Sequence, residues 1–459
     1  MNQGIIKYQL ADVEVQMIMH GLDVLDILRF SRCNKFLRHA SADSFAWKHA
    51  PELLISANDM IKIAIRVKQF CNLLCTDKSS PLQHIKLFLK CREDESWSQQ
   101  GLKMLLEAIT AFPICIKRIT CIDFSECHIG DFSCLFLAKI IKLLDNIRIL
   151  KIAKNYIRFH SIGLLVDALK NNPNISLIDL SLDNIGMGNK GAKLLSKLIR
   201  HCPGLKDLNL NMAGIGDEGA ISLASAVNFS TSLTSLNLES NVIENSGLEA
   251  LSDAIKKSSS ITSIFLQDND FDDDGVIVLS DAIKHNKSLT SISVGNYIKE
   301  SGLIALASAI EHNETLTSVN IIDNPMHGSS ISILSKAIKN NKSLMCLGLI
   351  RCNLYDHDII IFADLVKHSK NIRHLDVSGN YIESVSMKAL LDTFLYNKNQ
   401  TSVSFKYNQK LLINKSLLMA MLKHGKISAQ TEKEEDTLIV VQDSAIERVP
   451  YHKNKRTTQ

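Results

Sequence analysis

The chain has 459 residues, 46% of them hydrophobic and 22% charged, and its formal net charge is +4. This composition is typical of a globular protein, and the charge is too small to indicate nucleic acid as the main ligand. The 11 cysteines include no C-x-x-C pair. Their scatter excludes a disulfide framework or a tetrahedral zinc site as the organising feature and predicts reduced thiols.

No stretch approaches the roughly 18 consecutive apolar residues that a membrane-spanning helix needs, and residues 1–10 lack the pattern of a secretory signal. We therefore expect a cytoplasmic protein, with the nucleus as the alternative location, and no contact with a membrane. No motif indicates a metal, a cofactor or a catalytic group, so we expect the protein not to be an enzyme.

The first 50 residues carry apolar side chains at helical spacing, which predicts a small all-α module of about three short helices. This module resembles the F-box, a resemblance carried by Leu10, Glu14, Ile18, Leu22, Asp26, Ile27, Leu28, Cys33, Phe36 and Trp47. The resemblance implies docking on the Skp-type adaptor of a cullin-RING ubiquitin ligase through Leu10, Glu14, Ile18, Leu22, Leu28, Phe36 and Trp47.

The F-box family usually has proline after its first leucine, where this chain has Ala11. The first helix therefore lacks the residue that presets its φ angle. A second interpretation of residues 1–50 is a helical cap that shields the first repeat of the following domain.

Residues 51–115 follow a weaker pattern. Residues 52–75 are compatible with a linker helix, while Ile85 and Leu87 imitate a repeat strand ahead of a helix near residues 102–109. We interpret this segment as a helical linker followed by a degenerate zeroth repeat.

From residue 116 to residue 408 the pattern apolar-x-x-apolar-x-apolar recurs at intervals of 27 to 30 residues, most of them 28. Such regular self-similarity over eleven units is the signature of a stacked solenoid, in which each unit packs on its neighbours. The middle apolar residues of the units are Ile122, Leu150, Ile178, Leu208, Leu236, Ile264, Ile292, Val319, Leu347, Leu375 and Val403.

Within each unit the alternating apolar residues predict a short strand, with Leu236 and Leu238 pointing inward. A polar residue follows three positions after the last apolar one. An inward asparagine there can satisfy the amide and carbonyl groups of the backbone where it leaves the strand, and so form a ladder along the stack. We interpret the residues at this position as structural: Cys127, Asn155, Asn241, Asn269, Asn324, Cys352, Asn380 and Asn408.

The second half of each unit reads G-x-x-x-L-x-x-A-I, as in residues 247–255, 275–283 and 302–310. Leucine and isoleucine four residues apart predict a helix with one buried stripe, and the small alanines allow close packing. Each unit is therefore a strand, a turn, a helix and a return loop. The expected fold class is α/β, with parallel strands on the concave side of a solenoid and helices outside.

These motifs are similar to those of the leucine-rich repeat family, in particular its long subtype found in ribonuclease inhibitor, Ran GTPase-activating protein and NOD-like receptors. Residues 215–220 (IGDEGA) match the turn of that subtype and residues 232–238 (SLTSLNL) its strand. The similarity implies a solenoid at residues 116–424. Local departures are Asp183 and Ala213 at ladder positions, two extra residues in the unit of Ile178, and one residue fewer in the unit of Ile292, which shifts Asn296.

Eleven strands about 4.8 Å apart make a sheet long enough for a protein partner, whose usual footprint is roughly 800 Å² per side. The outward positions show no basic stripe and no row of aromatic residues, which argues against nucleic acid. One group combines apolar side chains with charged neighbours, as protein interfaces do. We predict that it binds the partner through Phe265, Asp268, Ile322, Asp323, Ile350 and Arg351. The alternative is that these side chains are shielded by loops or tolerated at the surface.

After residue 408 the pattern predicts a cap helix at residues 411–422 and a disordered tail at residues 425–459. Three acidic residues, 434–436, precede the β-prone run 438–441. A short strand that pairs back on the cap and a motif for the small ubiquitin-like modifier are the two interpretations of this run.

The leading function predicted from the sequence is substrate recruitment to a ubiquitin ligase, with the substrate bound on the concave face. The alternatives are a scaffold or sensor without a ligase, and a GTPase regulator like the Ran family member. The fold alone does not decide between them.

Overall fold

The computed structural model describes residues 117–172, 174–295, 298–326, 328–369 and 371–382, and the shorter stretches 16–18, 52–57, 64–65, 67–68, 85–91, 99–112, 386, 389, 402–404, 408, 428–430 and 439–441. The chain forms two compact units, Met1–Leu316 and Thr317–Gln459. Each unit is described by itself.

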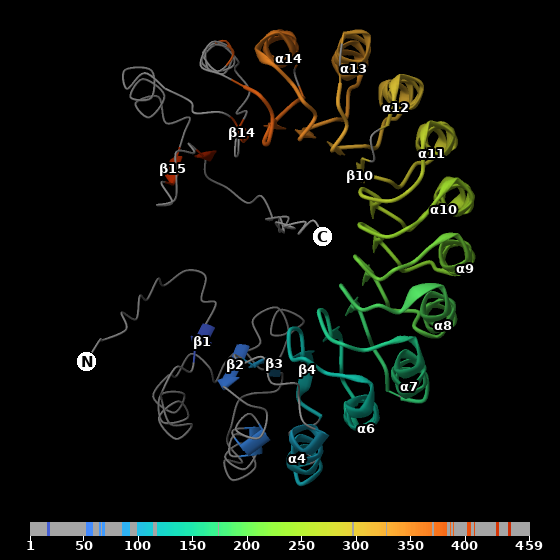
Figure 1. The fold of residues 1–459 in the computed structure, drawn as a ribbon, viewed down its shortest axis with the longest axis vertical. Helices are drawn as coiled ribbons and strands as arrows, with labels where there is room; N and C mark the ends of the chain where they lie inside the picture. Colours follow the sequence, from blue (N-terminus) through green and yellow to red (C-terminus); the bar gives the residue numbers. More distant parts are fainter. Residues whose placement is uncertain are drawn as a thin grey trace, which may run out of the picture. The chain divides into compact units, whose positions relative to one another are not determined.

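The first unit alternates strands and helices along the chain. Its described elements are β1 (Gln16–Ile18), β2 (Glu52–Ala57), β3 (Ile85–Cys91), α4 (Gln99–Thr110), β4 (Ile119–Asp123), η2 (Asp131–Ser133), α6 (Cys134–Leu143), β5 (Ile149–Lys151), α7 (Phe159–Lys170), β6 (Asp179–Ser181), α8 (Gly188–His201), β7 (Asp207–Asn209), α9 (Asp217–Phe229), β8 (Ser235–Asn237), α10 (Asn245–Lys257), β9 (Ser263–Phe265), α11 (Asp273–His285), β10 (Ser291–Val294) and α12 (Glu300–His312). The helices from α6 to α12 pack side by side on the outer side of the strands (Figure 1). The side of the strands that faces away from these helices is called the strand face.

The ten described strands of the first unit pair in parallel and in chain order. Their register aligns equivalent residues of successive repeats: Leu208 pairs with Leu236, and Leu236 pairs with Ile264. Parallel neighbours need a crossover connection, which the helix of each repeat provides. The predicted α/β solenoid is therefore confirmed.

The second unit has the same arrangement over its described residues. The strands β11 (Ser318–Ile322), β12 (Cys346–Ile350), β13 (His374–Asp376) and β14 (Ser402–Ser404) pair in parallel and in chain order. The helix α13 (Ser329–Asn340) follows β11, and α14 (Asp356–His368) follows β12. A separate antiparallel pair joins β15 (Ser428–Gln430) to β16 (Ile439–Val441).

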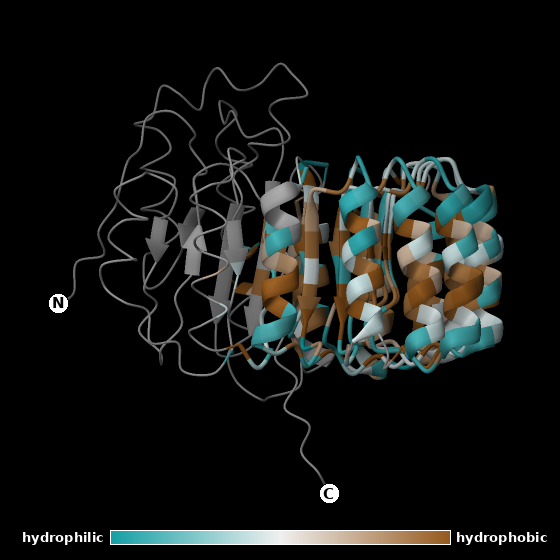
Figure 2. Ribbon diagram, turned by 90° about the horizontal axis from the view of Figure 1, so that it is seen from above, coloured by the Kyte–Doolittle hydropathy of each residue, from teal (hydrophilic) through white to brown (hydrophobic). Residues whose placement is uncertain are grey.

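The apolar pattern of each repeat forms the layer between strands and helices. In the repeat of β8 and α10, Leu236 and Leu238 are buried from the strand side, and Leu248, Leu251 and Ile255 from the helix side. Figure 2 shows the same distribution along the helices, whose middles are hydrophobic and whose ends are hydrophilic. Burial of this layer is the main stabilising contribution to the stack.

The asparagine ladder is confirmed. Asn241 Nδ2 donates hydrogen bonds to the carbonyl oxygens of Leu210 and Leu238, both at 2.9 Å. Its Oδ1 accepts from the backbone amides of Ala213 at 3.1 Å and Ile215 at 2.9 Å. One side chain thus satisfies buried backbone groups of two successive repeats, at the point where the backbone leaves the strand.

At two ladder positions a thiol takes over part of this role. Cys127 Sγ donates to the carbonyl oxygen of Leu89, and Cys352 Sγ donates to that of Ile321, each at 3.3 Å. Burial raises the pKa of Cys352 to about 12, so the thiol keeps the proton that it donates. These contacts support the structural interpretation of both cysteines.

A second set of asparagines, which the sequence pattern did not single out, lies where helices end. Asn286 Nδ2 donates to the carbonyl oxygens of Ile255 at 2.6 Å and Ser258 at 2.9 Å, both in the preceding repeat. Its Oδ1 accepts from the amides of Ser288 and Leu289 in its own loop. Carbonyl groups at a helix end have no partner within the helix, and this side chain supplies one. Asn172 and Asn313 make the equivalent bonds to the preceding repeat.

The start of a helix is capped by a side chain of the preceding repeat. Asp217 Oδ1, in the first turn of α9, accepts from the amides of Glu244 at 2.8 Å and Gly247 at 2.9 Å at the start of α10. A Cβ on Gly247 would lie 2.6 Å from this oxygen, so the contact requires the glycine of the helical motif. Oxygens at this position also interact favourably with the positive end of the helix dipole. Asn189, Asn245 and Asp273 act in the same way.

The strand register corrects the assignment of one repeat. Leu150 pairs with Leu180, not with Ile178. Both residues fit the sequence pattern, because residues two apart in an alternating run have the same period, and only the hydrogen-bonded register distinguishes them. The interval of 30 residues therefore lies between Leu150 and Leu180. The ladder position of this repeat falls on buried Ile185 instead of Asp183.

Two described stretches near the N-terminus contradict the helix predictions, whereas residues 64–65 and 67–68 are helical, as predicted for the linker. Gln16–Ile18 forms β1 and Glu52–Ala57 forms β2, where the sequence predicts helices. Short apolar runs fit either periodicity, and parallel pairing of β1 with β2 and of β2 with β3 shows that both are strands. Where the sequence predicts the zeroth repeat, β3 is followed by α4, the order of a strand and a helix in the later repeats.

Near the C-terminus, β16 covers the β-prone run, and its partner is β15 rather than the predicted cap helix. Both strands lie within the segment that the sequence predicts to be disordered. The cap helix predicted at residues 411–422, and the shifted Asn296, lie outside the described residues.

We expect Asn241→Ala to lower the free energy of unfolding by about 3 kcal/mol, because each buried backbone group left without a partner costs about 1–3 kcal/mol. Urea unfolding measures this loss, and amide hydrogen exchange should quicken at Ala213 and Ile215, which donate to the missing oxygen. The control is Asn237→Ala, whose side-chain oxygen accepts from the amide of Glu239 at a partly buried site. Equal losses in the two variants would contradict the ladder.

Candidate functional site

Phe265 lies in β9 on the strand face of the first unit, and its side chain is half-buried. The register places Asn237 on one side of it and Ser293 on the other. Ser293 is buried, although the sequence predicts that it faces solvent. The aromatic side chain is therefore only partly available to a partner.

In the repeats where the structure describes it, the residue just before the ladder position adopts a left-handed backbone conformation, with φ between 52° and 59° where it is not glycine. This conformation costs a non-glycine residue roughly 1–2 kcal/mol and turns the chain sharply at the end of the strand. These residues are called the strand-exit column. They are Glu126, Lys154, Asn184, Met212, Ser240 and Asp268 in the first unit, and Asp323, Arg351 and Gly379 in the second.

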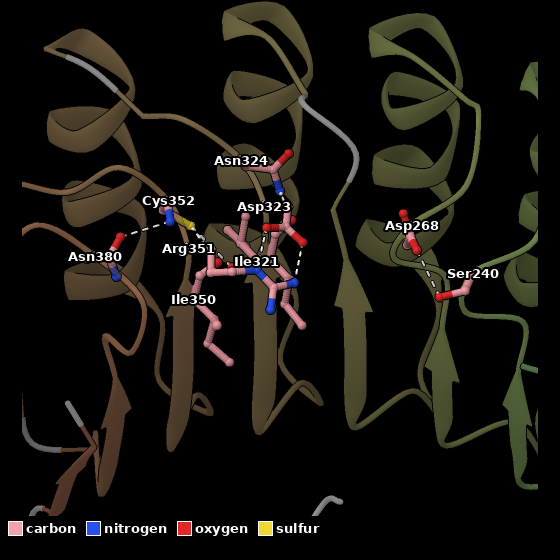
Figure 3. A network of polar contacts seen from close by, with 10 residues as sticks. Ser240, Asp268, Ile321, Asp323, Asn324, Ile350, Arg351, Cys352 and Asn380 are labelled. Carbon is pink, nitrogen blue, oxygen red and sulfur yellow. Dashed lines mark hydrogen bonds and ion pairs between the residues drawn. The ribbon is translucent and has the colours of Figure 1, made fainter. Parts of the chain in front are cut away.

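Side chains of the strand-exit column pair between neighbouring repeats of the first unit. Lys154 Nζ lies 2.7 Å from Glu126 Oε1. Ser240 Oγ donates to Asp268 Oδ2 at 2.9 Å (Figure 3). The predicted site residue Asp268 is exposed, and its carboxylate is already engaged within the chain.

In the second unit the same column pairs Arg351 with Asp323. Nε and Nη2 of Arg351 donate to the two carboxylate oxygens of Asp323, a bidentate arrangement that fixes the guanidinium plane (Figure 3). Gly379 leaves room for it, since a Cβ there would lie 2.6 Å from Arg351 Cγ. The two side chains are 39% and 38% exposed, so the pair stabilises the fold by at most about 1 kcal/mol. Its effect is to hold both charges in place.

Ile322 and Ile350 are direct neighbours at the ends of β11 and β12. Both side chains are half-buried on the strand face of the second unit. They immediately precede Asp323 and Arg351, so the structure brings four of the predicted site residues together. Phe265 and Asp268 belong to the first unit.

The first unit also carries a pair of acidic residues that the sequence analysis did not select. Asp179 of β6 and Asp207 of β7 are register partners on the strand face. Burial raises the pKa of Asp179, with Lys151 opposing the shift and Asp207 and Asp123 adding to it. Burial also raises the pKa of Asp207, against the effect of Lys206. The shifted repeat register concealed this pair, because it assigned Asp179 to the column of Asp123.

Among the described residues, no group of three or more histidine, cysteine, aspartate and glutamate side chains is arranged to hold a metal ion. No helix in the described part of the chain is long and apolar enough to cross a membrane.

A family model described as Leucine Rich repeat matches residues 201–224, 229–252 and 368–391. The chain contains leucine-rich repeats. Among solved structures, it is similar to the actin-binding site 2 of leiomodin-1, with 21% identity, 33% of this chain and 87% of that chain covered, and a TM-score of 0.29. It is also similar to an internalin (inlF) from Listeria monocytogenes, with 18% identity, 74% and 84% covered, and a TM-score of 0.40. No curated protein matches the sequence.

The predicted adaptor-binding residues precede the leucine-rich repeats that the family model matches. Ile18 lies in β1, where it pairs with Leu54 of β2. The remaining six lie outside the described residues: Leu10, Glu14, Leu22, Leu28, Phe36 and Trp47.

We expect Asp179→Asn to stabilise the protein at neutral pH by about 0.5 kcal/mol, because burial and then repulsion by the like charge of Asp207 on the neighbouring strand disfavour the ionised carboxylate. A raised pKa means that the folded chain binds the proton more tightly than the unfolded chain. The wild type therefore loses stability as pH rises from 3.8 through the raised pKa, and the gain from the substitution disappears below pH 3.8.

Thermal unfolding of both proteins between acidic and neutral pH measures this difference. Asp253→Asn, at an exposed position of α10, is the control and should change the midpoint little at any pH. A neutral or lower midpoint for Asp179→Asn at neutral pH would contradict the repulsion.

Proposed function

We propose that the chain is a scaffold that binds a protein partner on the strand face of its leucine-rich repeats, and that it catalyses no reaction itself. The observation that carries this proposal is the group formed by Ile322, Ile350 and the Arg351–Asp323 pair in the second unit. Two neighbouring apolar side chains beside fixed charges are the composition of an interface centre with a polar rim.

The internal pairing of Arg351 suits this role. A guanidinium held by two hydrogen bonds loses little conformational freedom when a partner covers it. The pair would then set the orientation of the partner more than its affinity. The same pairing counts against the GTPase regulator alternative, in which this arginine would have to reach a bound nucleotide.

Phe265 is proposed as a separate contact in the first unit, because a half-buried aromatic ring can add contact area at low entropic cost. We also propose that the repeats belong to the long, ribonuclease-inhibitor-like subtype. Intervals of 28 residues and the 13-residue helices of α9, α10 and α11 support this assignment.

A finer proposal is that the scaffold recruits a substrate to a cullin-RING ubiquitin ligase in the cytoplasm or nucleus through residues 1–50. Its support is the F-box-like sequence pattern. A second candidate function is a scaffold in which the N-terminal residues extend the repeat sheet and no ligase takes part. The pairing of β1 with β2 favours this candidate.

We expect the double substitution Ile322→Asp with Ile350→Asp to weaken partner binding at least tenfold, about 1.4 kcal/mol, because it places charge at the apolar centre. Partners are identified by crosslinking and mass spectrometry on the wild type, and their affinities for purified variants are then measured. The matched control is Ile360→Asp, an isoleucine 46% exposed on α14, and Phe265→Ala is measured in parallel. Unchanged affinity in a folded double variant would reject the strand-face site.

For the ligase proposal, we expect the full chain to bind a purified Skp-type adaptor in a pulldown, and Leu10→Asp with Leu28→Asp to abolish that binding while the repeats stay folded. Absence of binding by the intact chain would reject the ligase role. In the second candidate the same substitutions leave partner binding on the strand face unchanged.

A further inference from the structure

Bulky side chains are exposed at one edge of the first unit. They neither pack within the stack nor belong to the strand face. Phe132 of η2 is 89% exposed, Tyr156 is 65% exposed and Leu135 of α6 is 48% exposed. Single exposed apolar residues are ordinary, but these three belong to two successive repeats whose backbones pair at Gly130 and Tyr156. The patch formed by His128, Phe132, Leu135 and Tyr156 is called the aromatic rim.

Backbone contacts hold the two halves of the aromatic rim together. Tyr156 forms an isolated parallel bridge with Gly130, and its amide donates to the carbonyl oxygen of Ile129 at 2.8 Å. Asp131 Oδ1 accepts from the amide of Arg158 at 2.8 Å, so the turn that carries Phe132 is fixed to the start of α7. The bulky side chains of the two repeats therefore lie at one edge of the unit.

The rings of His128 and Tyr156 contact each other in the free chain. His128 and Tyr156 have ring centroids 5.6 Å apart, and His128 Nδ1 lies 3.3 Å from the hydroxyl oxygen of Tyr156. Phe132 and Leu135 are three residues apart in continuous helical backbone, a spacing that places side chains on the same side of a helix. The chain therefore loses little conformational entropy at the rings of His128 and Tyr156 when a partner covers them.

The repeats that carry the aromatic rim and the repeat that follows have more positive than negative charge, since residues 117–201 contain 13 lysines and arginines and 7 aspartates and glutamates. Two of these carboxylates are engaged within the chain: Glu126 pairs with Lys154, and Asp131 accepts from the backbone amide of Arg158. The basic residues include Lys139, Arg158 and Lys190, and the Lys190 ammonium lies 5.0 Å from the Phe159 ring centroid. The net positive charge of these repeats therefore complements carboxylates and repels a basic segment.

We propose that the aromatic rim binds an acidic segment of a protein partner, with a bulky apolar side chain of that segment packed against Phe132 and Tyr156. Its carboxylates would face the guanidinium of Arg158. This surface is separate from the strand face, so the proposal goes beyond the function proposed above and gives the scaffold a second point of contact.

The test selects binders of the immobilised full chain from a phage-displayed library of random short peptides. We expect the enriched peptides to combine aspartate or glutamate with an aromatic residue or leucine. Synthetic versions should lose at least tenfold in affinity for Phe132→Ala, Tyr156→Ala and Arg158→Glu, and their affinity should fall as salt is raised. Because the substituted side chains are exposed, unchanged thermal unfolding is expected for each variant.

The matched control is Phe229→Ala, which removes a phenylalanine 69% exposed at the end of α9, where the Arg200 guanidinium lies over its ring. It should leave peptide affinity unchanged. The proposal is overturned if no peptide is enriched over the empty matrix, if the enriched peptides are not acidic, or if the rim variants bind them as the wild type does. If only the Ile322→Asp with Ile350→Asp variant loses peptide binding, the peptides bind the strand face and not the aromatic rim. The experiment therefore shows which of the two proposals has failed.

Discussion

The fold depends on how the backbone is satisfied where it leaves a parallel strand. At that point the amide and carbonyl groups lose their neighbours in the sheet, and a buried group without a hydrogen bond is costly. The side chain of Asn241 supplies these bonds across two repeats, as Asn286 does at a helix end and Asp217 at a helix start. All three contacts cross between repeats. Each repeat is therefore completed by its neighbour, which is why the stack, rather than a single repeat, is the stable structure.

The repeats were predictable because residues that make these contacts recur at the same place in each unit. Prediction failed where the pattern is degenerate, as at Ile178 and Leu180, which fit the same alternation. It also failed at β1 and β2, whose short apolar runs fit a helix equally well. The helix-end asparagines were missed although a signal exists. The pattern asparagine, any residue, serine or threonine, leucine recurs at residues 286–289, 313–316 and 341–344.

The candidate site was less predictable than the fold. A period of two identifies the side chains that point away from the helices, but it does not show what they touch. Arg351 and Asp323 looked like free charges at the edge of an apolar patch, whereas the strand-exit conformation turns them toward each other. That conformation could not be read from residue type, because lysine, methionine and arginine adopt it here and none of them favours it. Only the backbone structure identifies the pairing.

Most side chains of a repeat pack against neighbouring repeats or form hydrogen bonds with them. Side chains that do neither therefore indicate which surfaces bind partners. Asp179 and Asp207 place like charges side by side, and Phe132 exposes a ring that gains nothing from the hydrophobic effect. Residues that depart from the usual packing and charge patterns without stabilising the fold are expected on surfaces that bind a partner. The acidic pair lies on the strand face, and Phe132 lies in the turn before a helix. Substitutions on the strand face or in the turn before a helix leave the ladder residue of the repeat unchanged. One stack can therefore present two chemically different surfaces.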